Sequence, residues 1–211
     1  RRFFHDMQDD EAWISCHKDD LWIFDKCILS TKLGYNCGPA DMWVPEPGIY
    51  IVRPCVNLAG MSRGAEFRHI EKETTDLPPG HFWCEIFEGR QLSVDFNLNK
   101  QSRTYEQGLT TEGIREFHEP LWKFNKWIKV DDVIDYPVIL SELKGDYDCI
   151  NCEFIGDKLI EVHLRANEDM GEYTEIIPVW DESEQNAQHY FSNGYEYVEE
   201  KDYKRLGFFK R

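Results

Sequence analysis

The spacing of apolar and polar positions along this chain predicts short helices and strands in no regular alternation. A continuous apolar run at 49–52, set between Pro47 and Pro54, predicts a strand that is buried on both faces. Apolar residues spaced for one helical face predict helices over 21–33 and 133–144. Because the predicted strands and helices are mixed without a repeating βα order, we expect an α+β fold.

Two β-hairpins are expected where segments of alternating character flank a turn. The first is predicted from residues 81–87 and 91–97, around a turn at 88–89. The second spans 150–165, and its turn is interpreted as a three-residue loop over 156–158. The second hairpin carries the functional prediction, because its alternation separates two faces cleanly.

With a three-residue loop, the second hairpin has an apolar face that includes Ile160 and an opposite, polar face. The polar face carries Asn151, Glu153, Glu161, His163 and Arg165. Glu153 then lies directly across from Glu161, and like charges in that relation destabilise a strand pair. A Mg²⁺ ion bound by both carboxylates would remove this repulsion.

The pattern alone leaves two other arrangements of this hairpin open. The polar face can be a solvated surface on which Arg165 and Lys158 neutralise the glutamates. A two-residue loop would instead place Glu153 and Glu161 on opposite faces of the sheet. Either arrangement would remove the predicted metal site.

Composition and charge narrow the classes of partner. The 211 residues suit one domain or two small lobes, and 41% hydrophobic and 14% aromatic residues indicate a folded chain. The formal net charge of −16 repels phosphate backbones at long range, so no nucleic-acid partner is expected. No apolar stretch approaches the roughly 18 residues that span a bilayer, so no membrane partner is expected.

The seven cysteines are an odd number, and most of them lie in apolar or strand-like segments. This distribution is typical of reduced thiols rather than a disulfide framework, and it favours a cytoplasmic location. Cys149 and Cys152 form an isolated CxxC with no second pair, so neither a redox role nor a zinc role is expected for them.

The second hairpin resembles the C-terminal metal-binding motif of the ATP-grasp superfamily, which includes D-alanine–D-alanine ligases and glutathione synthetases. That motif has an acidic residue on one strand, a turn, and a strand reading roughly Glu-x-Asn-x-Arg. Glu153 and Glu161 match the two acids, Arg165 matches the Arg, and His163 stands in place of the Asn. The resemblance implies Mg²⁺ bound at Glu153, Glu161 and His163, and an Arg165 that stabilises the transferring phosphoryl group.

Upstream segments resemble the same family in its order along the chain. Asp25-Lys26 opens a predicted helix as the family's Asp-Lys does, and that Lys contacts the ATP phosphates. Residues 51–54 resemble Val-Val-Lys-Pro, with Arg53 in place of the phosphate-binding Lys. The loop after this strand resembles the family's phosphate-covering loop, with Gly60, Ser62, Arg63 and Gly64 as the expected contacts.

Residues 84–95 resemble the family's hinge between lobes. The resemblance implies that Glu85, with the backbone of Ile86 and Phe87, meets the adenine edge. Gln91 stands where the family has an acid that holds the ribose hydroxyls. A Gln amide can still hydrogen-bond a hydroxyl, although without charge assistance.

The resemblance covers residues 21–167 and implies two small α+β lobes with a nucleotide cleft between them. Residues 1–20 are then an N-terminal tail or fragment, and 21–84 are the small lobe with the phosphate loop. Residues 85–211 form the larger lobe, with the hinge and the metal-binding hairpin. The family's usual N-terminal substrate domain is expected to be missing or reduced to a fragment.

The function implied is an ATP- and Mg²⁺-dependent ligase that joins a small-molecule carboxylate to an amine through an acyl phosphate. Two alternatives stay open. The departures at Arg53, Gln91 and His163 favour a non-catalytic, nucleotide-binding derivative. An α+β interaction protein without a nucleotide site would instead use surface aromatics such as Trp122 and Trp127 as contacts. Substrate identity and oligomeric state are not determined by the sequence.

Overall fold

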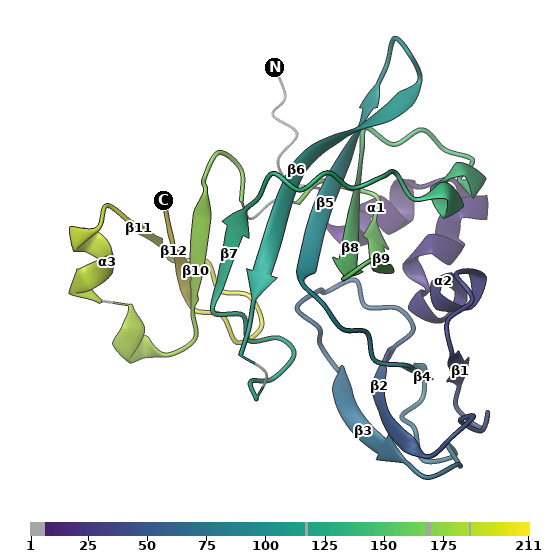
Figure 1. Cartoon of the computed structure of the whole chain (residues 1–211). Coiled ribbons are helices and arrows are strands. Elements are labelled where there is room, and N and C mark those ends of the chain that lie inside the picture. The colour runs from purple at the N-terminus through teal and green to yellow at the C-terminus, as the bar shows by residue number, and fades with distance from the viewer. Residues whose placement is uncertain (1–6, 117, 168–169, 186) are drawn as a thin grey trace.

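The computed structural model describes residues 7–116, 118–167, 170–185 and 187–211. The strands form two antiparallel sheets, one of four strands and one of eight, with short helices packed beside them (Figure 1). The predicted α+β fold is confirmed. Within the described residues, no helix has the length and apolar character needed to cross a membrane.

The smaller sheet has the strand order β1-β4-β2-β3. Its strands are β1 (Cys37–Pro39), β2 (Gly48–Pro54), β3 (Glu66–Ile70) and β4 (His81–Cys84). The predicted strand at 49–52 is confirmed as β2, but it is not buried on both faces, because the Ile49 side chain is 59% exposed. Tyr50 and Val52 instead pack with Trp83 into a small core that belongs to this sheet.

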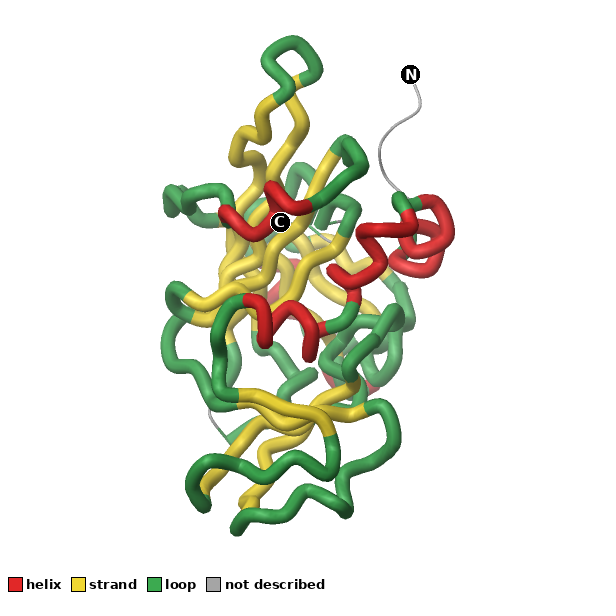
Figure 2. Tube along the Cα trace, turned by 90° about the vertical axis from the view of Figure 1, so that its right-hand side faces the viewer, coloured by secondary structure: helices red, strands yellow, loops and turns green. Residues whose placement is uncertain are grey.

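The larger sheet has the order β11-β12-β10-β7-β6-β5-β8-β9, so β9 is an edge strand. Its strands are β5 (Gln91–Asn99), β6 (Thr104–Ile114), β7 (Lys126–Lys129), β8 (Cys149–Ile155), β9 (Lys158–His163), β10 (Glu175–Val179), β11 (Glu196–Val198) and β12 (Gly207–Lys210). Figure 2 shows the β5–β6 hairpin projecting at the top of the molecule and the smaller sheet at the bottom.

The first predicted hairpin is wrong. Strand β4 pairs with β1 and β2, whereas β5 pairs with β6 and β8 in the other sheet. Residues 85–90 therefore connect the two sheets and do not form a turn between paired strands. Alternation in 81–87 and 91–97 identified two strands correctly, but pairing depends on distant partners that local pattern does not reveal.

The helices before the smaller sheet are α1 (Asp9–Ser15), η1 (Lys18–Phe24) and α2 (Lys26–Lys32). The predicted helix over 21–33 is thus broken at Asp25, whose extended backbone ends η1 and whose carboxylate caps α2. Helix α1 lies in the segment expected as a tail, and residues 1–6 of that segment lie outside the described residues. The Asp25-Lys26 helix start is confirmed.

These helices cover one face of β5, β8 and β9 and form the main hydrophobic core (Figure 1). The core includes Ala12, Ile23, Phe24, Leu29, Val94, Phe96, Ile150, Cys152 and Val162. The opposite face of the same strands stays polar and is available for a binding site. Because the helices cover only one face of these strands, the side chains on the other face of the β8–β9 hairpin remain accessible to a ligand.

The predicted helix over 133–144 is also wrong. This segment runs extended and then forms a single short 3₁₀ helix, η2 (Val138–Glu142). Pro137 precedes η2 and has no N–H to donate, and the Gln107 side chain binds the backbone of residues 132 and 134. The remaining short helices are η3 (Glu182–Glu184) and α3 (Gln188–Ser192).

A buried carboxylate joins this extended segment to the N-terminal helices. Asp20, fully buried, accepts hydrogen bonds from the Lys144 backbone (2.8 Å), the Gly145 backbone (2.8 Å) and the Tyr147 hydroxyl (2.6 Å). Burial raises the pKa of Asp20, but these hydrogen bonds outweigh burial and hold the pKa below its usual value. The carboxylate therefore stays charged and connects the segment to η1.

We predict that Asp20→Ala lowers the free energy of unfolding by about 3 kcal/mol, because several donors lose their acceptor in a buried place. Tyr147→Phe removes a single hydrogen bond and should cost about 1 kcal/mol. Urea unfolding measures both. The control is Asp19→Ala at an exposed neighbour, which should change stability by less than about 0.5 kcal/mol. Equal stability of Asp20→Ala and Asp19→Ala would contradict the assignment.

Candidate functional site

Two adjoining cavities meet at the polar face of the β8–β9 hairpin. The larger, of about 760 Å³, is lined by β2 and β3 of the smaller sheet, by the connection 85–90 and by β6, β8 and β9 of the larger sheet. The second, of about 530 Å³, lies against the polar face of the larger sheet. Both volumes are in the range of small-molecule sites. The residues common to both cavities are Ser62, Arg63, Gln91, Phe124, Glu153 and Glu161.

The turn between β8 and β9 has two residues, because Ile155 pairs directly with Lys158. The predicted three-residue loop is therefore wrong. A register shift then follows, since Phe154 pairs with Leu159 but Glu153 pairs with Glu161. This β-bulge inserts one extra residue in β9 and returns the two glutamates to one face. The predicted pairing of Glu153 with Glu161 is confirmed, although by a different backbone route.

The bulge also changes the place of Ile160. Ile160 was expected on the apolar face in the core, but Leu159 takes that place in the main core. Ile160 is buried in the wall of the larger cavity, and its carbonyl accepts a hydrogen bond from the Arg53 guanidinium at 3.2 Å. The extra residue of a bulge reverses the alternation locally, so a period-two pattern misplaces one residue.

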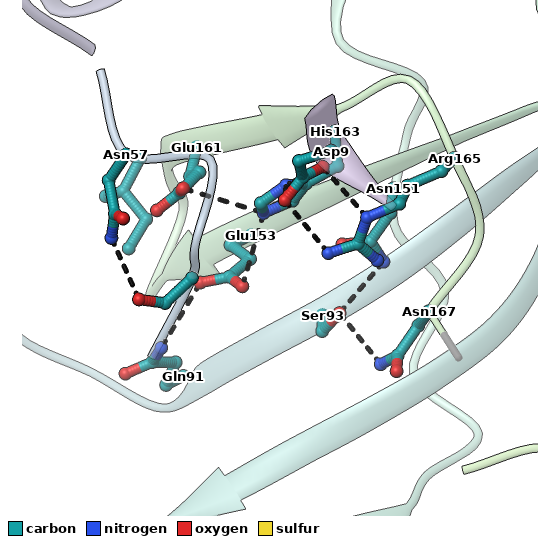
Figure 3. Close-up of polar contacts among 12 residues, drawn as sticks. Asp9, Asn57, Gln91, Ser93, Asn151, Glu153, Glu161, His163, Arg165 and Asn167 are labelled. Carbon is teal, nitrogen blue, oxygen red and sulfur yellow. Dashed lines mark hydrogen bonds and ion pairs between the residues drawn. The ribbon is translucent and has the colours of Figure 1, made fainter. Parts of the chain in front are cut away.

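His163 lies between three carboxylates (Figure 3). Its Nε2 is 3.7 Å from Glu153 and 3.6 Å from Glu161, and its Nδ1 is 3.0 Å from Asp9. Burial lowers the pKa of His163, but contacts with Asp9 and Glu153 outweigh burial and raise the pKa to about 10. The ring is therefore an imidazolium at neutral pH and places a positive charge between the glutamates.

Asp9, at the start of α1, was missed by the sequence reasoning. Both of its carboxylate oxygens accept from Arg165, at 2.8 and 3.1 Å, and its side chain is only 3% exposed. Burial raises the pKa of Asp9, but His163 and Arg165 outweigh burial and hold the pKa well below its usual range. Three consecutive acids at 9–11 gave no reason to single out the first, because their burial depends on how α1 packs.

Glu161 is paired with a cation from outside the hairpin. Lys26, the first residue of α2, lies 2.8 Å from Glu161, and both side chains are largely buried. Burial raises the pKa of Glu161, but Lys26 and then His163 outweigh burial and lower it. Helix α2 and strand β9 are therefore joined by a buried ion pair at the point where the cavities meet.

The alternative arrangement, in which Arg165 and Lys158 neutralise the glutamates, is thus wrong. Lys158 pairs with Asp157 in the turn. Arg165 pairs with Asp9. The positive charges beside the glutamates come from Lys26 and His163. The cluster as a whole holds three carboxylates and three cations: Asp9, Glu153, Glu161, Lys26, His163 and Arg165.

Arg53 lies in the larger cavity, buried to 7% exposure, with its guanidinium over the Phe82 ring. One of its nitrogens donates to the Ile160 carbonyl, whereas its Nε has no hydrogen-bond partner among the described residues. A buried, permanently charged donor without an acceptor is unfavourable, so this position suits an anion. Lys26 lines the same cavity.

The connection between the sheets contributes residues predicted to contact adenine. Glu85, Ile86 and Phe87 all line the larger cavity. The Glu85 carboxylate accepts a hydrogen bond from the Asn36 backbone at 2.8 Å, and the Phe87 ring packs against Tyr35. The carboxylate of Glu85 therefore supports the connection itself.

Gln91, the first residue of β5, lies at the junction of the two cavities. Its Nε2 lies 3.5 Å from the Glu153 carboxylate, which is a weak contact at most (Figure 3). The structure therefore brings Gln91 next to the glutamate pair, where its amide can be redirected to a ligand.

The predicted phosphate loop lies over both cavities. Ser62 and Arg63 line both of them, and Gly60 lines the second. The backbone at Gly60 and Ser62 has positive φ values of 61° and 48°, and the Asn57 amide donates to the Gly60 carbonyl at 2.9 Å. Gly64 lines neither cavity. It packs against Pro54, which a Cβ at this position would meet at 3.0 Å.

The C-terminal segment approaches the same loop, which the sequence reasoning did not foresee. Arg63 forms an ion pair with Asp202 at 2.5 Å and lies over the Tyr203 ring. Lys201 and Arg205 line the second cavity. Loop and segment are 139 residues apart in the chain, so only the folded sheet brings them together.

The aromatic side chains beside the second cavity pack against one another in pairs. Trp122 meets Trp180 edge to face, and Trp127 packs against Phe124. Trp127, Trp122 and Trp180 also line the second cavity. These side chains therefore form a cavity wall.

Comparison with known proteins identifies the fold through solved structures alone, since no family model and no curated protein matches the chain. N5-carboxyaminoimidazole synthetase from Staphylococcus aureus, complexed with ADP, has a TM-score of 0.59 and 10% identity over 97% of this chain and 74% of the other. Carboxyaminoimidazole ribonucleotide synthase from Aspergillus clavatus, complexed with ATP, has a TM-score of 0.55 and 10% identity over 90% and 68%.

A third match, to an ATP-grasp superfamily protein from Archaeoglobus fulgidus, has 15% identity and a TM-score of 0.46, too low to support an argument. The chain spans 48% of that protein's length. The matches to the two synthetase structures extend over 97% and 90% of this chain. The chain has an ATP-grasp fold, as the resemblance of its motifs implied.

Proposed function

We propose that this chain binds ATP and Mg²⁺ in the larger cavity and joins a carboxylate to an amine through an acyl phosphate. One observation carries the proposal. Glu153 and Glu161 face each other across the β8–β9 turn and line both cavities, so they lie where a nucleotide and a second substrate would meet. The structures of similar fold that are described as ADP or ATP complexes support the choice of nucleotide.

The larger cavity suits ATP in size and in chemistry. Its volume of about 760 Å³ accommodates a nucleotide, and Ile51, Phe67 and Ile86 supply apolar surface for a base. Lys26 and Arg53 line the same cavity, and the Arg53 Nε has no partner among the described residues. Phosphate oxygens would satisfy that donor, so we place the phosphates beside Lys26 and Arg53 and the base toward residues 85–87.

The carboxylates fit Mg²⁺, because hard oxygen ligands from one or two acids are what this ion takes in nucleotide sites. We propose Glu153 and Glu161 as its ligands; bound there, the ion would neutralise charge on the phosphates. The predicted third ligand, His163, has a pKa raised to about 10, so at neutral pH its ring is protonated and offers no lone pair. We therefore propose that His163 orients the two glutamates through its positive charge.

In the proposed reaction, a carboxylate oxygen of the substrate attacks the γ-phosphorus of ATP, and ADP leaves. The amine then attacks the carbonyl carbon of the acyl phosphate, inorganic phosphate leaves, and the amine loses a proton as the C–N bond forms. The chain would contribute positioning and charge, since phosphoryl transfer needs little covalent help. Arg165, in the second cavity and tied to Asp9, would orient the acyl phosphate.

The lobes follow from the same proposal. We propose that residues 21–84 act as the smaller lobe and 85–211 as the larger, with residues 85–90 as the hinge. The pairing of β4 and β5 in separate sheets supports a hinge at this point. The loop with Gly60, Ser62 and Arg63 would then cover the phosphates.

A non-catalytic nucleotide-binding protein is the second candidate. It is favoured by the balanced cluster, in which Lys26 and His163 already neutralise the glutamates. A metal ion must compete with these cations for the same carboxylates, which weakens its binding. Turnover, rather than binding, separates this candidate from the ligase.

We predict that Mg²⁺ with ATP raises Tm by about 5 °C or more when the nucleotide exceeds its Kd a hundredfold, and that either alone does less. Glu161→Gln should abolish the added effect of Mg²⁺. The matched control, Glu196→Gln on the exposed face of β11, should keep it. Each ligand-induced shift is taken against the same variant without ligand, so altered baseline stability does not matter. No shift in the unaltered chain would refute nucleotide binding.

If the chain is a ligase, we further predict that it releases ADP only when both a carboxylate and an amine are present. A panel of amino acids and short peptides, assayed by coupled detection of ADP, tests this. Release with one active pair and its loss in Arg165→Gln would support catalysis. If ATP binds with Mg²⁺ yet no pair yields ADP, the non-catalytic candidate is favoured instead.

The Asp9–His163 pair predicts a pH dependence of stability. The pKa of His163 is raised from 6.5 to about 10, so its contribution is full below pH 6.5 and is lost as pH rises toward 10. The pKa of Asp9 is lowered from 3.8, so its contribution is present above that pH and is lost in acid. The pair should therefore stabilise the fold most between about pH 3.8 and pH 6.5.

Accordingly, Asp9→Asn should cost about 3 kcal/mol near pH 6, because it leaves buried cations without their partner. It should also flatten the loss of stability between pH 6.5 and 10, since His163 then titrates nearer its ordinary pKa. Urea unfolding across this range measures both effects. Asp10→Asn, at an exposed neighbour, serves as control. Equal slopes in Asp9→Asn and the unaltered chain would contradict the pairing.

A further inference from the structure

A group of thiols lies at the junction of α2 and the smaller sheet, away from the carboxylate cluster. Cys27 is in the first turn of α2, Cys55 follows β2, and Asp25 caps α2. One ligand atom from each of these three residues lies within 4.8 Å of the other two. None of the three is fully buried, and both cysteines are free thiols.

Two more thiols extend this group. Cys37 and Cys84 are directly paired residues of β1 and β4, and both are free. The Cys37 thiol hydrogen-bonds with the thiols of Cys27 and Cys84. The Cys27 thiol therefore contacts both Cys37 and Cys55.

The backbone already holds two of the ligand residues together. The Lys26 N–H donates to the Cys55 carbonyl at 2.7 Å, which fixes the start of α2 against the end of β2. The Asp25 Oδ1 accepts from the backbone of Cys27 and Ile28, so the carboxylate is oriented by the helix it caps. A site assembled from oriented ligands loses little entropy when an ion binds.

We propose that Asp25, Cys27 and Cys55 form a Zn²⁺ site that joins α2 to the smaller sheet. Mixed thiolate and carboxylate ligands suit this borderline ion, whereas Mg²⁺ and Ca²⁺ take oxygen alone. Tetrahedral Zn²⁺ places its sulfur ligands roughly 3.8 Å apart, given Zn–S bonds of about 2.3 Å. Small side-chain movements would bring the observed group to that spacing.

The zinc site is separate from the proposed Mg²⁺ site, but it would set the position of two of its neighbours. Lys26 stands between Asp25 and Cys27 in the chain, and Arg53 stands two residues before Cys55. An ion that ties these segments together would hold both cations in the larger cavity. The proposal does not depend on ATP binding, and its test uses no nucleotide.

The test begins with protein reduced by a phosphine and stripped of metal by a chelator. Co²⁺ is titrated in as a spectroscopic probe, and Zn²⁺ affinity is measured by competition with a chromophoric chelator. We expect one equivalent of Co²⁺, with the visible bands of tetrahedral cobalt and a thiolate charge-transfer band, both lost when Zn²⁺ is added. Absence of the charge-transfer band would overturn the proposal.

Variants then assign the ligands. Cys27→Ser and Cys55→Ser should each weaken Zn²⁺ binding at least about tenfold, and Asp25→Asn, which keeps a capping side chain, should weaken it about tenfold. Cys16→Ser, at a free thiol outside the group, is the matched control and should not change the affinity. Unchanged affinity in both Cys27→Ser and Cys55→Ser would refute the site.

A second measurement avoids substitutions that fail to fold. The unaltered chain is alkylated with and without Zn²⁺, and each cysteine is followed by peptide mass spectrometry. Zn²⁺ should slow modification of Cys27 and Cys55 at least about tenfold and leave Cys16 unaffected. Equal rates with and without Zn²⁺ at Cys27 and Cys55 would overturn the proposal.

Discussion

The candidate site depends on a buried network of charges in which each carboxylate pairs with a cation from another strand, helix or loop. Glu161 is held by Lys26 of α2, and His163 stands between Glu153 and Glu161. Asp9 of α1 completes the network by accepting from His163 and from Arg165. Removal of any one member would leave an unpaired charge in a region that water reaches poorly, which is costly.

This network links the N-terminal helices to the hairpin by ion pairs. Strand β9 is at the edge of the larger sheet, so α1 can place Ala12 in the core on one face while Asp9 reaches the polar face. Apolar packing and ion pairing thus act on opposite sides of the same strand. The polar face stays charged and oriented without becoming a solvated surface.

The network also affects how a metal ion or a phosphate group would bind at the candidate site. Lys26 and His163 neutralise the glutamates in the absence of Mg²⁺, whereas Arg53 keeps a buried donor that has no partner among the described residues. A triphosphate arriving beside Arg53 would bring negative charge toward Lys26 and draw it from Glu161. The freed carboxylate would then be available to a divalent ion, which couples nucleotide binding to metal binding.

The amino-acid pattern alone was enough to predict the fold class, the β8–β9 hairpin, the facing of Glu153 and Glu161, and the helix start at Asp25-Lys26. These features depend on local periodicity, on capping or on motif spacing, all of which are set by residues close together in the sequence. It also pointed to ATP-grasp, because several motifs stood in that family's order, and the fold agrees.

The remaining features were set by packing between distant segments. The two-residue turn with its bulge, the separation of β4 and β5 into different sheets, and the roles of Asp9 and Asp202 depend on partners far along the chain. Asp9 and His163 are 154 positions apart, and no spacing rule relates them. Burial and charge pairing between distant segments are properties of packing, so a local pattern can name the charged side chains but not the partner of each one.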